Sequence, residues 1–267
     1  MNSNRDYSKH LDENDYLNAV FISVIGERDE QQDCYGYEMK PDEALFVVCD
    51  GMGGIAGGRA ASETAVKCIL ERYRQADEII QVQDFLLETA REASEAIRAL
   101  RTPEGAPVNA GTTLVAILVR GRQMYWSSVG DSRAYLFRGG QLVQFTLDHT
   151  YRTVLNGQLK AGMINLEEFT DASASRKAEA LVSYLGMNPF GLFDSGDEPI
   201  DLFSGDKVFI MTDGLYKLVS DEEIRGISEN FSNDEEIVNV LNLKAIRAAK
   251  KLSVARDNMT IALLHIK

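Results

Sequence analysis

Residues 112–146 read TTLVAILVRGRQMYWSSVGDSRAYLFRGGQLVQFT, and they carry the clearest structural signal in the chain. Apolar runs of strand length alternate there with short polar links. Two of these links, Arg120-Gly121-Arg122 and Arg138-Gly139-Gly140, have the glycine content of hairpin turns. The stretch therefore predicts a meander of four antiparallel strands. We expect these strands at Thr112–Val119, Met124–Val129, Ser132–Phe137 and Leu142–Thr146.

Further strands and helices are grouped on both sides of this meander. The elements expected before it are strands Ala19–Ile25, Cys34–Met39 and Leu45–Cys49 and helices Gly58–Gln75 and Val82–Leu100. The elements expected after it are strand Val208–Thr212, helices Asp221–Ile227 and Asp234–Val254, and strand Met259–Ile266. Grouped strands with short links favour an α+β fold, in which helices cover antiparallel sheets, over a doubly wound parallel sheet.

The length and composition are those of one globular unit. The chain has 267 residues, 45% of them hydrophobic, which is enough to bury a core without disulfides. Residues 1–17 are polar and are expected to form an N-terminal tail or cap. No linker rich in proline or serine divides residues 18–267, so we expect a single domain there.

Charge and cysteine usage exclude several classes of protein. The formal net charge is −13, which disfavours nucleic acids and anionic membranes as partners because both require clustered Lys and Arg. No apolar run approaches the roughly 20 residues of a membrane span. The three cysteines, Cys34, Cys49 and Cys68, form no CxxC pair, which suits a reducing compartment. We therefore expect a cytoplasmic protein.

Acidic side chains stand where the expected strands meet turns. Each of them alone is explained by turn chemistry, since Asp-Gly is a common turn pair. Taken together, carboxylates that converge from distant positions would repel one another unless a cation neutralised them. Ligation by oxygen alone suits Mg²⁺ or Mn²⁺ rather than zinc or copper. The residues concerned are Asp33, Asp50, Asp131, Asp213 and Asp257.

Seven short motifs resemble, in the same order, those of the bacterial type 2C metal-dependent protein serine/threonine phosphatases, the PPM family. They are GERDEQQD (26–33), VCDGMGG (48–54), GTT (111–113), VGDSRAY (129–135), LDHT (147–150), TDGL (212–215) and DNMT (257–260). The resemblance covers residues 19–267. It implies a four-layer α-β-β-α sandwich, two antiparallel sheets flanked by helices, with two metal ions in the cleft between the sheets.

The resemblance also assigns metal ligands. Asp50 is similar to the carboxylate that bridges both ions, and the Gly51 carbonyl to a ligand of one of them. Asp213 and Asp257 resemble ligands of the other ion. Asp33 would hold a metal-bound water or a metal directly. The implied cofactors are two divalent cations, Mn²⁺ or Mg²⁺.

Two further roles follow from the same likeness. Asp131 resembles the ligand of a third, weaker metal site. Arg28 resembles the residue that grips the substrate phosphate, for which the guanidinium fork is suited, and with Asp50 it would form the catalytic pair. The implied reaction is hydrolysis of phosphoserine and phosphothreonine in proteins by direct attack of a metal-bridging water or hydroxide. Phosphorylated proteins, such as a serine/threonine kinase and its substrates, are the expected signalling partners.

Several positions depart from the family pattern or invite another interpretation. Gln31 replaces the usual Asn, and its longer side chain is expected to alter the support of Arg28. Met52 stands where eukaryotic relatives carry a histidine proposed as general acid, so the proton donor stays open. His149 is interpreted as a structural hydrogen-bonding residue. Cys34 and Cys49 adjoin proposed ligands, but strand alternation turns them into the core.

Two alternative functions are compatible with parts of the sequence. Residues 51–56 (GMGGIA) fit a dinucleotide-binding fingerprint, which would need a second parallel strand ending in Asp or Glu about 20 residues later. A catalytically silent regulator of the same fold that binds phosphoproteins is the other alternative, although every ligand position is filled. Residues 151–199 match the family least and correspond to its variable flap, where substrate choice is expected to reside.

Overall fold

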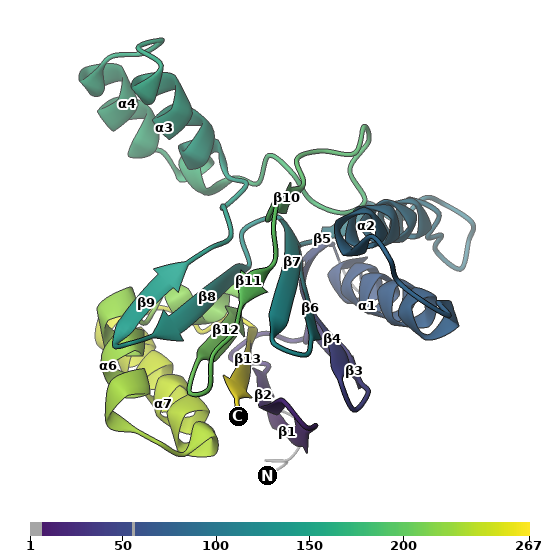
Figure 1. Cartoon of the computed structure of the whole chain (residues 1–267). Coiled ribbons are helices and arrows are strands. Elements are labelled where there is room, and N and C mark those ends of the chain that lie inside the picture. The colour runs from purple at the N-terminus through teal and green to yellow at the C-terminus, as the bar shows by residue number, and fades with distance from the viewer. Residues whose placement is uncertain (1–6, 55–56) are drawn as a thin grey trace.

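Two antiparallel sheets lie face to face in the computed structural model, which describes residues 7–54 and 57–267 (Figure 1). The first sheet has the order β1 (Tyr7–Glu13), β2 (Leu17–Val24), β13 (Met259–Ile266), β12 (Lys207–Met211), β8 (Arg133–Arg138) and β9 (Gln141–Gln144). The second has the order β10 (Asp194–Ser195), β7 (Gln123–Val129), β6 (Leu114–Arg120), β4 (Glu43–Gly53) and β3 (Asp33–Met39). Short strands β5 (Ala110–Thr112) and β11 (Ile200–Asp201) pair with β4 and β7.

Helices cover the outer face of each sheet. The second sheet is covered by α1 (Gly57–Gln75) and α2 (Val82–Arg98), and the first by α6 (Asp221–Asn230) and α7 (Asp234–Leu252) (Figure 1). The predicted four-layer α-β-β-α sandwich is therefore confirmed. Every strand pair among the described residues is antiparallel, which removes the basis for a dinucleotide-binding βαβ unit.

Alternation along the strands creates the layers. In β4, Leu45, Val47 and Cys49 pack toward α1 and α2, whereas Phe46 and Val48 pack between the sheets. Successive side chains of a strand point to opposite faces, so the next residue on the inner face is Asp50. The same rule builds all three buried clusters, one between the sheets and one under each helix pair.

Local sequence signals place several element boundaries well. Helix α6 begins with a complete capping box, in which Ser220 accepts from the Glu223 N–H and Glu223 accepts from the Ser220 N–H, as their spacing predicts. The four strands of the meander are all present, with ends shifted by at most two residues. None of the helices in the described part of the chain has the length and apolar character needed to cross a membrane.

Two regions go beyond the sequence-based expectations. Strand β1 pairs with β2 along its whole length, within the stretch 1–17 that was expected to be a tail or cap. In the region 151–199, α3 (Tyr151–Lys160) and α4 (Leu166–Ser173) project from the sandwich as a helical hairpin (Figure 1). The later part of that region returns to the body, where Leu185 is fully buried in the core under α1 and α2.

Candidate metal centre

The predicted site aspartates gather at one end of the sandwich, at or near the ends of strands from both sheets. Asp33 and Asp50 are direct register partners on β3 and β4 of the second sheet. Asp213 follows β12 and Asp257 precedes β13, and these two strands pair with each other in the first sheet. Asp131 lies in the link from β7 to β8, where the chain crosses from one sheet to the other. Both sheets therefore contribute to one site.

Hydroxyl groups join the two sheets beneath these carboxylates. The Thr212 hydroxyl in the first sheet donates to Asp33 Oδ2 in the second at 2.8 Å, and it accepts from the Thr260 N–H at 2.9 Å. The Thr260 and Ser23 hydroxyls are bonded to each other at 3.0 Å. Gln31 extends the network, because its amide donates to the Ser23 hydroxyl at 2.8 Å and accepts from the Asp33 N–H at 3.2 Å. The Gln31 side chain thus holds the backbone of Asp33 in place.

The main chain of Asp50 is fixed by two threonines of the neighbouring segment. Its N–H donates to the Thr113 hydroxyl at 2.8 Å, and its carbonyl accepts from the Thr112 hydroxyl and the Thr113 N–H, both at 2.9 Å. The next residue must be glycine, since a Cβ on Gly51 would lie 2.1 Å from the carbonyl oxygen of Gly58 at the start of α1. Asp50 therefore has a rigid backbone below a side chain that faces the cleft.

Asn258 anchors the loop that carries Arg28. Its side-chain oxygen accepts from the Gln32 N–H at 2.8 Å, and its amide donates to the carbonyls of Ile25 and Glu30 at 2.8 and 3.0 Å. The loop between β2 and β3 is thereby held against the start of β13. Arg28 projects from it with 57% of its side chain exposed and donates to Asp257 at 2.5 Å. It therefore stands at the mouth of the site rather than inside it.

The pKa shifts show that the carboxylates of the site are close enough to affect one another. Burial raises the pKa of Asp33 to about 7, and the charges of Asp213 and Asp257 add to the effect. Burial also raises the pKa of Asp50 well above its usual range, followed in order by the charges of Asp33, Asp213, Asp131 and Asp257. The pKa of Asp131 rises to about 6 through burial and the neighbouring Asp213. Each shift is the expected response of a buried anion among like charges.

The aspartates share a neighbourhood without forming a closed coordination shell. Within residues 7–54 and 57–267, no three acidic, histidine or cysteine side chains are arranged so that they could hold a metal ion. Two of the predicted ligands are instead engaged by cationic side chains, Asp213 by Lys217 and Asp257 by Arg28, each at 2.5 Å. The ligand roles of the aspartates and of Gly51 therefore stay predictions.

His149, Cys49 and Cys34 have the structural surroundings that the sequence predicts for them. His149 is buried, and its Nδ1 accepts from the Gly130 N–H at 3.1 Å. Cys49 is fully buried in the core under α1 and α2, and Cys34 packs against the same cluster. Burial raises the pKa of Cys34 to about 11, so its thiol stays protonated at neutral pH. Neither cysteine has the character of a reactive thiolate.

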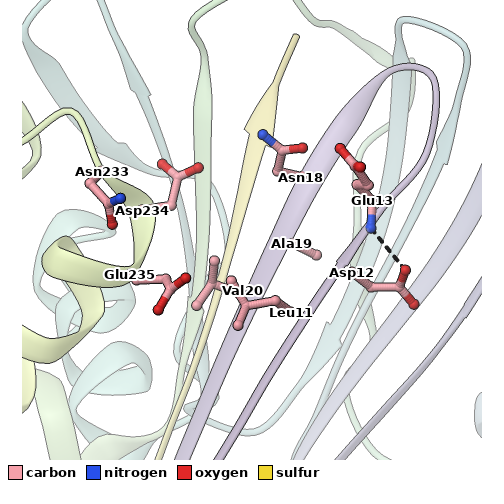
Figure 2. Close-up of a pocket in the computed structure, with 9 residues that line it drawn as sticks. All are labelled: Leu11, Asp12, Glu13, Asn18, Ala19, Val20, Asn233, Asp234 and Glu235. Carbon is pink, nitrogen blue, oxygen red and sulfur yellow. Dashed lines mark hydrogen bonds between the residues drawn. The ribbon is translucent and has the colours of Figure 1, made fainter.

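A separate surface pocket lies at the opposite end of the first sheet (Figure 2). It has a volume of about 440 Å³ and is lined by residues of β1, β2 and the start of α7, including four acidic side chains. Asn18, which lines it, pairs with His265 at the end of β13 that is far from Asp257. Two of the acidic groups already have cationic or imidazole partners, Glu235 with Lys9 and Asp234 with His265. We assign no catalytic role to this pocket.

A sequence model described as "Protein phosphatase 2C" matches residues 23–244. The chain belongs to the protein phosphatase 2C family. Among similar relatives is the protein phosphatase PhpP of Streptococcus pneumoniae, 30% identical over 212 residues, with 78% of this chain and 82% of the relative covered. The family and enzyme class that the motifs predict, a type 2C serine/threonine protein phosphatase, are confirmed.

Solved structures of the family agree with this fold. The Streptococcus agalactiae serine/threonine phosphatase superposes with a TM-score of 0.80 at 25% identity, covering 94% of this chain and 100% of that one. The catalytic domain of the serine/threonine protein phosphatase PstP, solved in complex with two manganese ions, gives a TM-score of 0.72 at 26% identity, covering 94% and 98%. Two-metal binding is thus a property of a relative with the same architecture.

Sequence reasoning missed two groups in the site. The first comprises the Thr212, Thr260 and Ser23 hydroxyls, which the strand pattern places on the inner face by alternation alone. The second comprises Tyr216 and Lys217. Tyr216 donates to Asp131 at 3.2 Å, and Lys217 pairs with Asp213. The spacing of four residues between Asp213 and Lys217 is a helical ion-pair spacing and could have revealed this contact.

Proposed function

We propose that this chain hydrolyses phosphoserine and phosphothreonine in proteins by direct transfer of the phosphoryl group to water, with two divalent cations, Mn²⁺ or Mg²⁺, as cofactors. The observation that carries the proposal is the state of Asp33. This residue is 6% exposed, and its Oδ1 has no hydrogen-bond partner, although Asp50 lies directly opposite. An unpaired carboxylate oxygen among other buried carboxylates is unfavourable unless a cation binds there.

The donor set fits hard divalent cations. All the proposed donors are oxygen atoms, those of the carboxylates of Asp33, Asp50, Asp131, Asp213 and Asp257 and of the Gly51 carbonyl. Mg²⁺ and Mn²⁺ prefer such donors, whereas zinc and copper prefer nitrogen or sulfur. We propose Asp50 as the bridging ligand, Asp213 and Asp257 as ligands of one ion, and Asp33 as a ligand or a holder of bound water. The ions of the similar PstP domain support a pair of sites.

The chemistry follows from charge. When bound, two divalent cations lower the pKa of the attacking water and offset charge on the phosphoryl oxygens. Asp50 is half-buried, and its backbone is fixed by Thr112 and Thr113, which would keep the ligand geometry constant during turnover. The bond between phosphorus and the serine or threonine oxygen breaks, a bond from phosphorus to the water oxygen forms, and the alcohol leaves with a proton. No phosphorylated form of the protein is required.

Arg28 is proposed to orient the substrate. Its guanidinium lies at the mouth of the site, where its fork can take two oxygens of a phosphate dianion. The ion pair with Asp257 holds Arg28 in place before substrate arrives, and 57% exposure of the side chain leaves it accessible to a phosphorylated segment of another protein. Phosphorylated proteins, such as a kinase and its targets, are therefore the proposed partners.

Residues 18–267 are proposed to form the phosphatase domain, with residues 1–17 as an N-terminal tail or cap, of which β1 lies at the edge of the first sheet. The variable flap is proposed to extend over 151–199, and its projecting helices α3 and α4 offer a surface for substrate recognition (Figure 1).

The direct test is release of phosphate from p-nitrophenyl phosphate and from a phosphothreonine peptide with Mn²⁺, with and without EDTA. We expect turnover that needs the metal and is abolished by EDTA. Asp50→Asn should lose at least about a thousandfold in kcat and keep a native circular dichroism spectrum, because a ligand of both ions is lost. A well-folded wild-type protein without activity in any divalent metal would point instead to a silent phosphoprotein-binding regulator.

A further inference from the structure

The position of Lys217 adds a positive charge to the carboxylate cluster. Lys217 directly follows the short helix α5 (Asp213–Tyr216), one helical turn beyond Asp213, and its ammonium contacts Asp213 Oδ2 at 2.5 Å. The side chain is 49% exposed, so the ammonium reaches the aspartates from the rim of the site. Lys217 thus forms an ion pair with Asp213, a proposed metal ligand.

The residue before Lys217 contacts a second carboxylate of the cluster. Tyr216 donates to Asp131, whereas Lys217 pairs with Asp213. These two consecutive residues, at the end of α5 and directly after it, therefore engage two carboxylates, and the ammonium lies on the side of the cluster formed by Asp131 and Asp213.

A second contact occupies Asp131 on the same side. The Tyr216 hydroxyl donates to Asp131 Oδ2 at 3.2 Å, and the guanidinium of Arg133 lies over the Tyr216 ring, 3.7 Å from its centroid. Arg133 is itself fixed by a forked pair with Asp148 at 2.7 and 3.0 Å. Arg133 thus holds Tyr216 in place, and one carboxylate oxygen of Asp131 already accepts a hydrogen bond from a protein side chain.

The negative charges of the aspartates are equalled by two divalent cations together with the ammonium of Lys217. When all five are ionised, as metal binding would require, the carboxylates of Asp33, Asp50, Asp131, Asp213 and Asp257 carry five negative charges. Two divalent cations and one ammonium carry five positive charges. Arg28 pairs with Asp257 in the structure, and it is left out of this count because the proposed phosphate dianion would take up its charge when substrate binds. A third divalent ion beside Asp131 would instead have to approach against the ammonium of Lys217.

We propose that Lys217 is a built-in cation of the metal centre, which takes the place of a third divalent ion beside Asp131 and limits the cluster to two. This inference rests on the proposed two-metal function. It makes Lys217 a residue that positions charge and sets metal stoichiometry, rather than one that contacts the substrate. The weak third site implied by the family resemblance is then closed in this chain by its own side chain.

The test is the number and affinity of Mn²⁺ ions bound to the full chain, measured by equilibrium dialysis and by electron paramagnetic resonance of free Mn²⁺. We expect two ions for the wild type and three for Lys217→Met. The affinity for the additional ion should rise at least about tenfold over the wild type, equivalent to about 1.4 kcal/mol. Lys217→Arg keeps the charge and should bind two ions. Adding Asp131→Asn to Lys217→Met should return the count to two.

Lys244→Met is the matched control. Lys244 pairs with Glu223 on the surface at 3.1 Å, so the variant has the same change of net charge away from the cluster. Two ions with unchanged affinity in Lys217→Met would overturn the proposal, as would three ions in the wild type or a gain in Lys244→Met. Lys217→Gln repeats the measurement if the Met variant is unstable. A wild type that binds no Mn²⁺ would instead refute the proposed function.

Discussion

Replacing Thr212 by valine would test the bond that joins the two sheets under the site. Valine has nearly the shape of threonine but lacks the hydroxyl, which donates to Asp33 at 2.8 Å and accepts from the Thr260 N–H at 2.9 Å. A hydrogen bond to a charged group contributes about 1.5–3 kcal/mol, and a buried unpaired N–H costs about 1–3 kcal/mol. The two effects overlap, so we expect a loss of about 3 kcal/mol in the free energy of unfolding.

The assay is urea unfolding followed by circular dichroism in the presence of Mn²⁺. With a slope of about 3 kcal/mol per molar urea, the midpoint should fall by about 1 M. Thr212→Ser keeps both bonds and should retain most of the stability. Thr170→Val is the matched control, because Thr170 is exposed on α4 and donates only to the Leu166 carbonyl of its own helix. A midpoint for Thr212→Val equal to that of Thr170→Val would refute the role assigned to the cross-sheet bond.

Two further predictions concern substrate binding and pH. Arg28→Ala should raise KM for a phosphopeptide about tenfold or more, whereas Arg28→Lys should recover part of the loss; an unchanged kcat and KM in the alanine variant would remove Arg28 from the site. Burial lowers the pKa of His149, so the unfolded chain binds its proton more readily, and the stability that this residue contributes should be lost as pH drops below about 6.5. His149→Asn keeps an acceptor for the Gly130 N–H, so its free energy of unfolding relative to the wild type should rise between about pH 7 and pH 5, and a constant difference would contradict the assignment.

Strand alternation explains why so much of the fold and site could be predicted. The apolar residues of β4 occupy two buried clusters, and the same period of two carries Asp50 onto the inner face. Once Asp50 has that orientation, its register partner Asp33 must share it. Side-chain direction is thus encoded locally, within about ten residues of each aspartate, and motif order supplies the rest.

The parts that could not be predicted depend on contacts between distant segments. Strand β1 is polar and largely exposed, and only its pairing with β2 makes it a strand. Helix α4 buries none of its residues, so no periodic apolar pattern marks it, and its N-terminus is recognised only from the capping box of Asn165 and Glu168. The Tyr216 contact with Asp131 joins residues 85 positions apart, and no local pattern encodes such a distance.

The cost of holding several aspartates close together requires strong pairing of the strands that carry them. Asp33 has a pKa raised to about 7, so at neutral pH its ionised form is less favourable in the folded chain than in the unfolded one. Stability from this group is therefore lost as pH rises from about 4 toward 7, and the raised pKa values of Asp50 and Asp131 act in the same direction. The opposing stabilisation comes from the strands that carry them, since β2 and β13 pair over eight residues and β3 and β4 over seven. Apolar packing along the same strands, between the sheets and under both helix pairs, therefore opposes the repulsion among these anions and fixes the strand ends that carry them.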